Sequence, residues 1–353
     1  MRLLKFAQTY KEEISIAKIF LVWRLGLLVV SFLASKILAF KFSFPYAGSL
    51  LISTKLPDWI WGWGNFDGVH YLTLANHGYD GFGTQVFFPL YPMLGHLFNN
   101  FWSLLLISNL SIFLAAILFF KLVKKKFGGK TAWWSVIFLF VFPVSFFFGA
   151  IYTESFFLLL VLLTFSLKKI QSAIFGVLAG ATRLVGIFAN PFGIFGLGLY
   201  VFYLWWRFGR PLFFLSAQSA FGSRATAVTD LVTPFQTVFR YLKIFITVNP
   251  SSYSYWIAIL EFGAFGFGFI VLGWLTLKKK MPREWLIFSW AAYILPSLSG
   301  TLSSMPRYLI TIFPIYIGLA LIKNTKIKII IAIISVVLLI VFTALFTRGY
   351  WVS

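Results

Sequence analysis

The sequence predicts an all-α fold, a polytopic transmembrane helical bundle with roughly 9–11 spans and a long first external loop. Of its 353 residues, 60% are hydrophobic and 21% are aromatic, and the mean hydropathy is +0.90. Apolar runs of about 20 residues recur along the chain, which is the length that a transmembrane helix needs. Because the bilayer core offers no water to the backbone, each segment must satisfy its own hydrogen bonds, which favours helices.

The basic residues lie between the apolar runs. The formal net charge is +21, and the lysines and arginines cluster at residues 124–126 with 130, 168–169, 278–280 with 283, and 323, 326 and 328. Such clusters mark cytoplasmic loops under the positive-inside rule. They predict a lipid bilayer as partner and no nucleic acid. The chain contains no cysteine, which excludes disulfides and thiolate chemistry.

The apolar runs also set the expected order of the spans. The clearest cover residues 19–40, 101–123, 131–150, 156–167, 254–277, 284–298, 308–322 and 326–346. Residues 1–18 are expected to form a cytoplasmic lead-in. Between residues 173 and 253 two alternatives stay open: either 173–206 crosses the membrane once, or it crosses twice and 231–248 adds a further crossing. We therefore expect one integral membrane domain, residues 1–353, in which residues 41–100 form the external loop.

That external loop gathers acidic residues and all of the histidines. The loop contains three of the chain's nine Asp and Glu residues, namely Asp58, Asp67 and Asp80, and the histidines at positions 70, 77 and 96. Asp67 has glycines close by on both sides, which permit the close approach that a catalytic carboxylate needs. At a water–membrane boundary it can act as a general base. The alternative is a helix N-cap. A plain cap is favoured for Asp58 and a turn for Asp80.

The spacing of the histidines, 7 and then 19 residues, matches no compact metal-ligand motif. We therefore predict no metal site. If residues 68–77 are helical, His70 and Tyr71 lie on the side of Asp67, because side chains three and four residues apart are neighbours on a helix. There His70 can form a hydrogen bond to a polar substrate.

Three of the charged residues at or within apolar segments are candidates for binding a ligand. Glu154 lies at the mouth of a span, Arg183 within one and Arg307 after an external proline. A charge at membrane depth is costly and needs a partner, water or an anionic ligand. Arginine suits a lipid phosphate because its guanidinium offers two parallel donors. An internal ion pair between Glu154 and Arg183 is an equal alternative, and Glu261 has no evident partner in the sequence.

Several of these motifs together resemble a known family. The run FDGVHYL at 66–72, then Ala75, GY at 78–79 and FPLYP at 88–92, resembles the PIG-V-type mannosyltransferases. The motifs YTES at 152–155, TR at 182–183 with Gly186, the 211–218 stretch and PRY at 306–308 follow in the same order. The family usually has Trp before the catalytic Asp, where this chain has Phe66.

The resemblance implies a GT-C glycosyltransferase, in which Asp67 matches the catalytic position of the first external loop. It implies transfer of a sugar, expected to be mannose, from a polyprenyl-phosphate donor to a glycan, glycolipid or protein acceptor, with inversion and without a cofactor. The enzyme would lie in a bacterial inner membrane with its active site facing outward. The expected substrate-binding residues are His70, Tyr71, Trp63, Tyr79, Glu154, Arg183, Gln218 and Arg307. The alternative function is a transporter or flippase for lipid-linked sugars.

Overall fold

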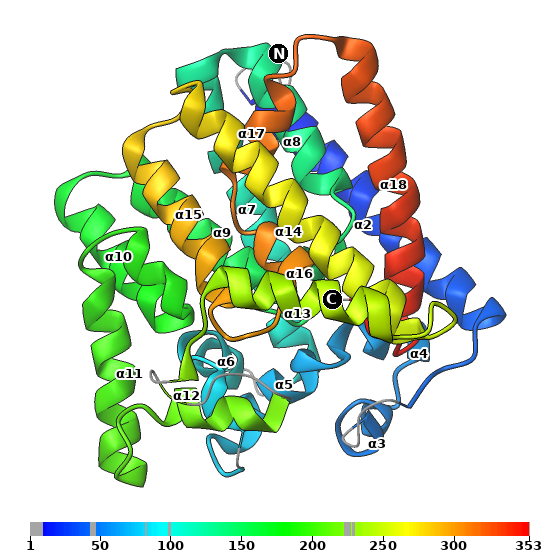
Figure 1. Cartoon of the computed structure of the whole chain (residues 1–353), viewed down its shortest axis with the longest axis vertical. Coiled ribbons are helices and arrows are strands. Elements are labelled where there is room, and N and C mark those ends of the chain that lie inside the picture. Colours follow the sequence, from blue (N-terminus) through cyan, green and yellow to red (C-terminus); the bar gives the residue numbers. More distant parts are fainter. Residues whose placement is uncertain are drawn as a thin grey trace, which may run out of the picture.

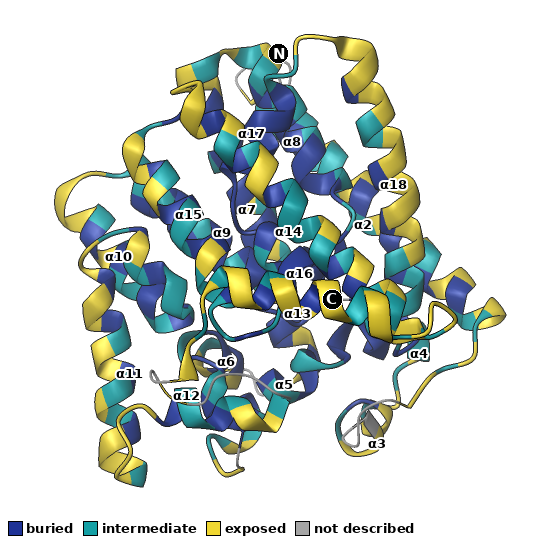
Figure 2. Ribbon diagram, viewed as in Figure 1, coloured by how far each residue is buried: buried dark blue, intermediate teal, exposed yellow. Residues whose placement is uncertain are grey.

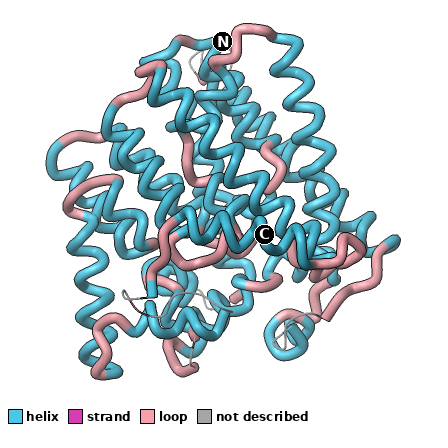
Figure 3. The backbone as a smooth tube through the Cα atoms, in the orientation of Figure 1, coloured by secondary structure: helices cyan, strands magenta, loops and turns pink. Residues whose placement is uncertain are grey.

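In the computed structural model, which describes residues 10–42, 47–81, 83–97, 100–221, 227 and 230–352, every regular element is helical (Figure 1, Figure 3). This confirms the predicted all-α class for the described residues. Residues 1–9 of the predicted lead-in lie outside them. Within this described part of the chain, four helices are long and apolar enough to cross a membrane: α2 (Lys11–Ile37), α7 (Phe101–Phe127), α14 (Tyr253–Leu277) and α18 (Thr325–Thr347). They contain the predicted spans 101–123, 254–277 and 326–346 and most of 19–40.

Shorter helices fill the centre of the bundle. α7 packs against α8 (Gly129–Val141) and α9 (Glu154–Ser166), and α8 also packs against α17 (Pro314–Ala320). Every residue of α17 is buried, whereas α18 at the edge of the bundle leaves many isoleucines and valines exposed (Figure 2). An apolar exposed face on a long apolar helix is what contact with lipid requires.

Two predicted spans prove to be interrupted. The segment 131–150 ends as an α-helix at Val141, just before Pro143, and continues as the 3-10 helix η4 (Ser145–Gly149). The segment 308–322 is divided between α16 (Met305–Leu309) and α17, which begins at Pro314. The first break precedes Pro143, which disfavours helical backbone in the preceding residue, and Phe142 has a ψ of 140°. The second break ends at Pro314, whose missing backbone N–H cannot continue a preceding helix but is tolerated at the start of a new one. The prediction of continuous helices there was wrong.

The undecided region 173–253 also takes a defined course. α10 (Lys169–Thr182) is followed by η5 (Leu184–Phe188), which turns back so that Asn190 donates a hydrogen bond to Ser172 Oγ at 3.1 Å. α11 (Gly193–Phe208) then runs beside α10 in the same direction and continues past its end (Figure 1). Residues 169–208 therefore make one net passage along the bundle.

Helix α13 (Pro234–Thr247) lies across the other helices in Figure 1. Its 14 residues span only about 21 Å at 1.5 Å per residue, which is shorter than the roughly 30 Å of a bilayer core. The structure therefore agrees with the first alternative for 173–253, in which residues 173–206 make one passage along the bundle and residues 231–248 make none.

The external loop predicted at 41–100 is a chain of short helices around one end of the bundle. They are α3 (Ala47–Leu50), η1 (Ile52–Thr54), α4 (Asp58–Trp61), η2 (Gly62–Gly64), α5 (Asp67–His77), η3 (Thr84–Val86) and α6 (Leu90–His96). α5 and α6 lie at the bottom of Figure 1, near α12 (Phe213–Ser216). The 3-10 helix η6 (Ala217–Phe221) follows α12, and α15 (Arg283–Ser297) and α16 face α5 across the cavity described next.

Candidate active site

A cavity of about 1050 Å³ opens between α5, the end of α10, α15 and α16. Its polar lining includes Asp67, His70, Arg183 and Arg307. Apolar side chains from η5, α15 and the segment before α13 line another part of its wall, namely Leu184, Val185, Ala292, Leu295, Leu298 and Leu231. The cavity therefore offers charged groups and hydrocarbon contacts to the same ligand.

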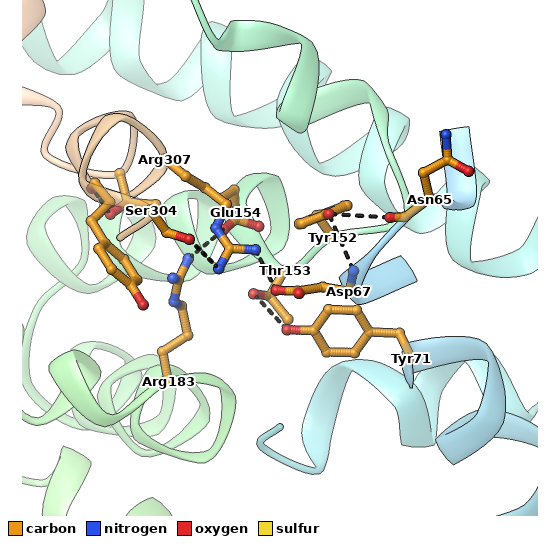
Figure 4. A network of polar contacts seen from close by, with 11 residues as sticks. Asn65, Asp67, Tyr71, Tyr152, Thr153, Glu154, Arg183, Ser304 and Arg307 are labelled. Atoms are coloured by element: carbon orange, nitrogen blue, oxygen red, sulfur yellow. Dashed lines mark hydrogen bonds and ion pairs between the residues drawn. The ribbon is translucent and has the colours of Figure 1, made fainter. Parts of the chain in front are cut away.

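Four charged side chains form one network at this cavity (Figure 4). Arg307 Nη1 pairs with Asp67 Oδ2, and its Nε lies 3.6 Å from Glu154 Oε1. Arg183 Nη1 lies 3.0 Å from the same Glu154 oxygen. Glu154 is only 1% exposed, so it depends on these cations for its stability as a carboxylate. Two negative and two positive charges balance one another.

The helix ends explain why the chain carries these charges here. Asp67 is the first residue of α5 and Glu154 is the first residue of α9. Arg183 follows the last residue of α10. Helix N-termini favour negative groups and C-termini favour positive ones, so the helix dipoles stabilise all three. Interrupted helices are tolerated at membrane depth where they line a cavity, and the breaks before α9 and after α10 both lie at this site.

The backbone around the site is strained at two positions. Phe66, just before Asp67, has a φ of 56°, and Ser304, three residues before Arg307, has a φ of 67°. Each such residue costs on the order of 1–3 kcal/mol, which the surrounding contacts must offset. Near Asp67 the contacts come from Tyr152, whose hydroxyl accepts the Asp67 N–H at 3.3 Å and donates to the Asn65 carbonyl at 3.1 Å.

The predicted cap roles of Asp67 and Asp58 are not observed. Each is the first residue of its helix, and the N-cap residues are Phe66 and Pro57. Asp67 uses its carboxylate to pair with Arg307. Asp58 Oδ2 lies 2.5 Å from Arg348 Nη1. In both cases the carboxylate forms an ion pair with an arginine that is distant in the sequence, in place of the hydrogen bond to a helix N–H that a cap would form.

Three other predicted residues, His70, Tyr71 and Gln218, line the cavity. The His70 ring stacks on Phe87 at 5.0 Å between centroids. Burial lowers the pKa of His70, and the charge of Asp67 opposes this only in part, so the ring is neutral at pH 7. The Tyr71 hydroxyl lies 3.4 Å from Thr153 Oγ1. Burial, with Glu154 and Asp67 nearby, raises the pKa of Tyr71, which keeps its proton.

The other predicted residues do not line this cavity. Glu154 lies behind the two arginines that it pairs with. The Tyr79 hydroxyl donates to the Phe87 carbonyl at 2.6 Å, which supports the cavity wall. Trp63 is fully buried, and the Arg24 guanidinium lies 4.2 Å from the centre of its ring. Trp63 borders a second cavity of about 640 Å³ between α2, α4 and α7.

Sequence reasoning missed residues that support the arginines. Tyr308 lines the cavity and lies 5.5 Å from the Arg183 guanidinium, and Ser304 Oγ accepts from Arg307 at 3.4 Å. Their positions within the SSMPRY run offered a signal. Glu261, unexplained by the sequence, accepts a 2.5 Å hydrogen bond from Tyr241, which in turn accepts the Leu302 N–H at 3.0 Å. This links α13 and α14 to the loop before Arg307.

No protein-family model, curated protein or solved structure matches the chain. The molecule is thus defined by its own features: over the residues that the structure describes, its regular elements are all helices, and four of these are long and apolar enough to span a membrane. Its distinguishing feature is a cavity that carries a carboxylate and two arginines. The function follows from what these groups can do chemically.

Proposed function

We propose that this protein is a membrane glycosyltransferase of the GT-C type that transfers mannose from a polyprenyl-phosphate donor to an acceptor hydroxyl. One observation carries the proposal: Asp67, Arg183 and Arg307 line a single cavity of about 1050 Å³ that also has an apolar wall. A lipid-linked sugar phosphate has matching parts, namely a hydrocarbon chain, an anionic phosphate and a polar sugar. The ordered motifs that resemble the PIG-V-type family support the same assignment.

Each step of the reaction has a residue suited to it. The acceptor oxygen attacks the anomeric carbon while the bond from that carbon to the phosphate oxygen breaks, which inverts the configuration. Asp67 takes the proton of the acceptor hydroxyl. Arg183 and Arg307 stabilise the negative charge of the leaving lipid phosphate, because guanidinium groups bind phosphate through two parallel donors. The rings of His70, Tyr71 and Phe87 offer surfaces for the sugar.

The proposed setting is the outer side of a bacterial inner membrane, with the basic clusters in the cytoplasm. The alternative, a transporter or flippase, needs polar groups along a path across the bilayer. The four charges described above are instead gathered at one cavity, beside one another. This arrangement favours chemistry at one depth.

The test is sugar transfer by purified protein supplied with labelled polyprenyl-phosphate mannose. Asp67→Asn keeps the shape of the side chain but removes the base, so we expect the rate to fall by about 10²–10⁴-fold, as loss of a general base does. Asp80→Asn is the matched control, because Asp80 lies in the same loop, is exposed and does not line the cavity. Near-normal transfer by the Asp67→Asn protein would exclude the catalytic role.

A further inference from the structure

The two arginines of the site share a single oxygen atom. Glu154 Oε1 lies 3.0 Å from Arg183 Nη1 and 3.6 Å from Arg307 Nε. Both guanidinium groups are therefore held next to each other from behind, and both residues also line the cavity. Two neighbouring guanidiniums that face a cavity form a site for an anion with several oxygen atoms, such as a phosphate.

The anion that contacts this site in the structure is the carboxylate of Asp67. Its Oδ2 pairs with Arg307 Nη1 (Figure 4), which is one of the donors that a phosphate would need. A carboxylate that is paired with a guanidinium is a weaker base, because the positive charge stabilises its ionised form. The Asp67–Arg307 contact therefore opposes the general-base role of Asp67.

We propose that Asp67 and the anionic headgroup of the substrate compete for Arg307, so that binding of the headgroup releases the base. In this exchange Arg307 turns its Nη atoms from Asp67 to the phosphate, while Glu154 retains the Nε side. Glu154 has capacity to do so, because its second oxygen, Oε2, is buried without a hydrogen-bond partner. Glu154 is then a positioning residue, which holds both arginines and does not touch the substrate.

This inference rests on the proposed function for the nature of the headgroup, a phosphate monoester or diester on a lipid chain. It gives the reaction an order: the donor binds first, and Asp67 becomes available to the acceptor hydroxyl only afterwards.

The experiment measures binding of farnesyl phosphate to the full-length protein in lipid nanodiscs. We expect Asp67→Asn to bind the phosphate about 10-fold more tightly than the wild type, equivalent to about 1.4 kcal/mol, because a neutral amide no longer competes for Arg307. Asp67→Ser provides a second neutral variant in case the amide alters the fold. Glu154→Gln should weaken binding, because the arginines lose the group that holds them together. Farnesol, which lacks the phosphate, should bind all variants equally.

Equal or weaker phosphate binding by both Asp67 variants would overturn the exchange. The same would follow if both variants also gained affinity for farnesol, since the effect would then not concern the charge. The two proposals fail separately. Tighter phosphate binding without any sugar transfer by the wild type would leave the exchange intact and reject the glycosyltransferase. Sugar transfer by the wild type without tighter phosphate binding by the Asp67 variants would support the glycosyltransferase and reject the exchange.

Discussion

Glu154 shows how one buried residue can organise the side chains of a cavity without lining it. An isolated carboxylate at 1% exposure would be very unfavourable. Two arginines and the N-terminus of α9 compensate it. The arginines in turn face the cavity with fixed spacing. The sequence suggested a Glu154–Arg183 pair or a phosphate site as alternatives, and the structure shows that the pair forms and that Arg183 nevertheless lines the cavity.

A pH effect is expected at the residue scale from His70. Its pKa is lowered in the folded protein by burial, so the unfolded chain binds more protons below its ordinary pKa of about 6.5. Stability should therefore be lost as the pH falls through about 6.5 towards the folded-state pKa. His70→Phe retains a ring against Phe87 but cannot be protonated.

Thermal unfolding in detergent at pH 8 and at pH 5.5 checks this. The midpoint of the wild type should fall more between the two conditions than that of the His70→Phe protein. Equal decreases in both proteins would show that other groups control the acid sensitivity.

At the scale of elements, α10 and α11 pack through glycines, as closely approaching membrane helices do. A Cβ atom on Gly180 would lie 2.1 Å from the Gly193 carbonyl oxygen, and one on Gly196 would lie 2.0 Å from that of Val177. The contact matters for the site because Arg183 follows the last residue of α10.

Gly180→Ala should therefore destabilise the protein by about 1–3 kcal/mol, the usual cost of overpacking, and reduce sugar transfer by displacing Arg183. Gly198→Ala is the matched control, since it lies in α11 with nothing within 4 Å of the added carbon. The measurements are the thermal midpoint and the transfer rate of each variant. If Gly180→Ala behaved like Gly198→Ala, close packing of these helices would not position Arg183.

Helix α13 makes polar contacts with the bundle and exposes both large apolar side chains and the charged residues Arg240 and Lys243. Thr237 donates to the Ser297 carbonyl at 2.7 Å, and Tyr241 donates to Glu261. Phe235, Phe239 and Ile246 are exposed by 85, 68 and 86%. Apolar and basic side chains together on an exposed surface are the composition that suits a helix lying in a membrane interface. Through Tyr241 and Leu302 it also supports the loop that leads to Arg307.

On the scale of the whole molecule, the basic clusters meet at one end. Lys124 pairs with Glu12 at 2.6 Å, Lys126 lies 5.8 Å from the Trp285 ring and Lys328 lies 4.8 Å from the Trp134 ring. The short helices α5, α6 and α12 lie at the opposite end (Figure 1). This separation is what the positive-inside rule requires of a protein with an outward-facing site.

The absence of native cysteine allows a direct test of orientation. Lys125→Cys places a single thiol at an exposed position in the basic last turn of α7. Ser251→Cys places one at an exposed position just before α14. A membrane-impermeant maleimide should label position 251 in intact cells and position 125 only after permeabilisation. The wild type serves as the unlabelled control. The reverse pattern would place the cavity on the cytoplasmic side.

The sequence by itself determined the helical class and the long apolar helices, because the hydrophobic effect and the need to satisfy backbone hydrogen bonds act on local composition. It also indicated Asp67, Arg183 and Arg307 individually. Only the tertiary structure decided which helices break at Pro143 and Pro314, how 169–208 folds back, and that these charges share one network. The physical reason is distance: Asp67 and Arg307 are 240 positions apart in the chain, and no local pattern records which buried cation meets which buried anion.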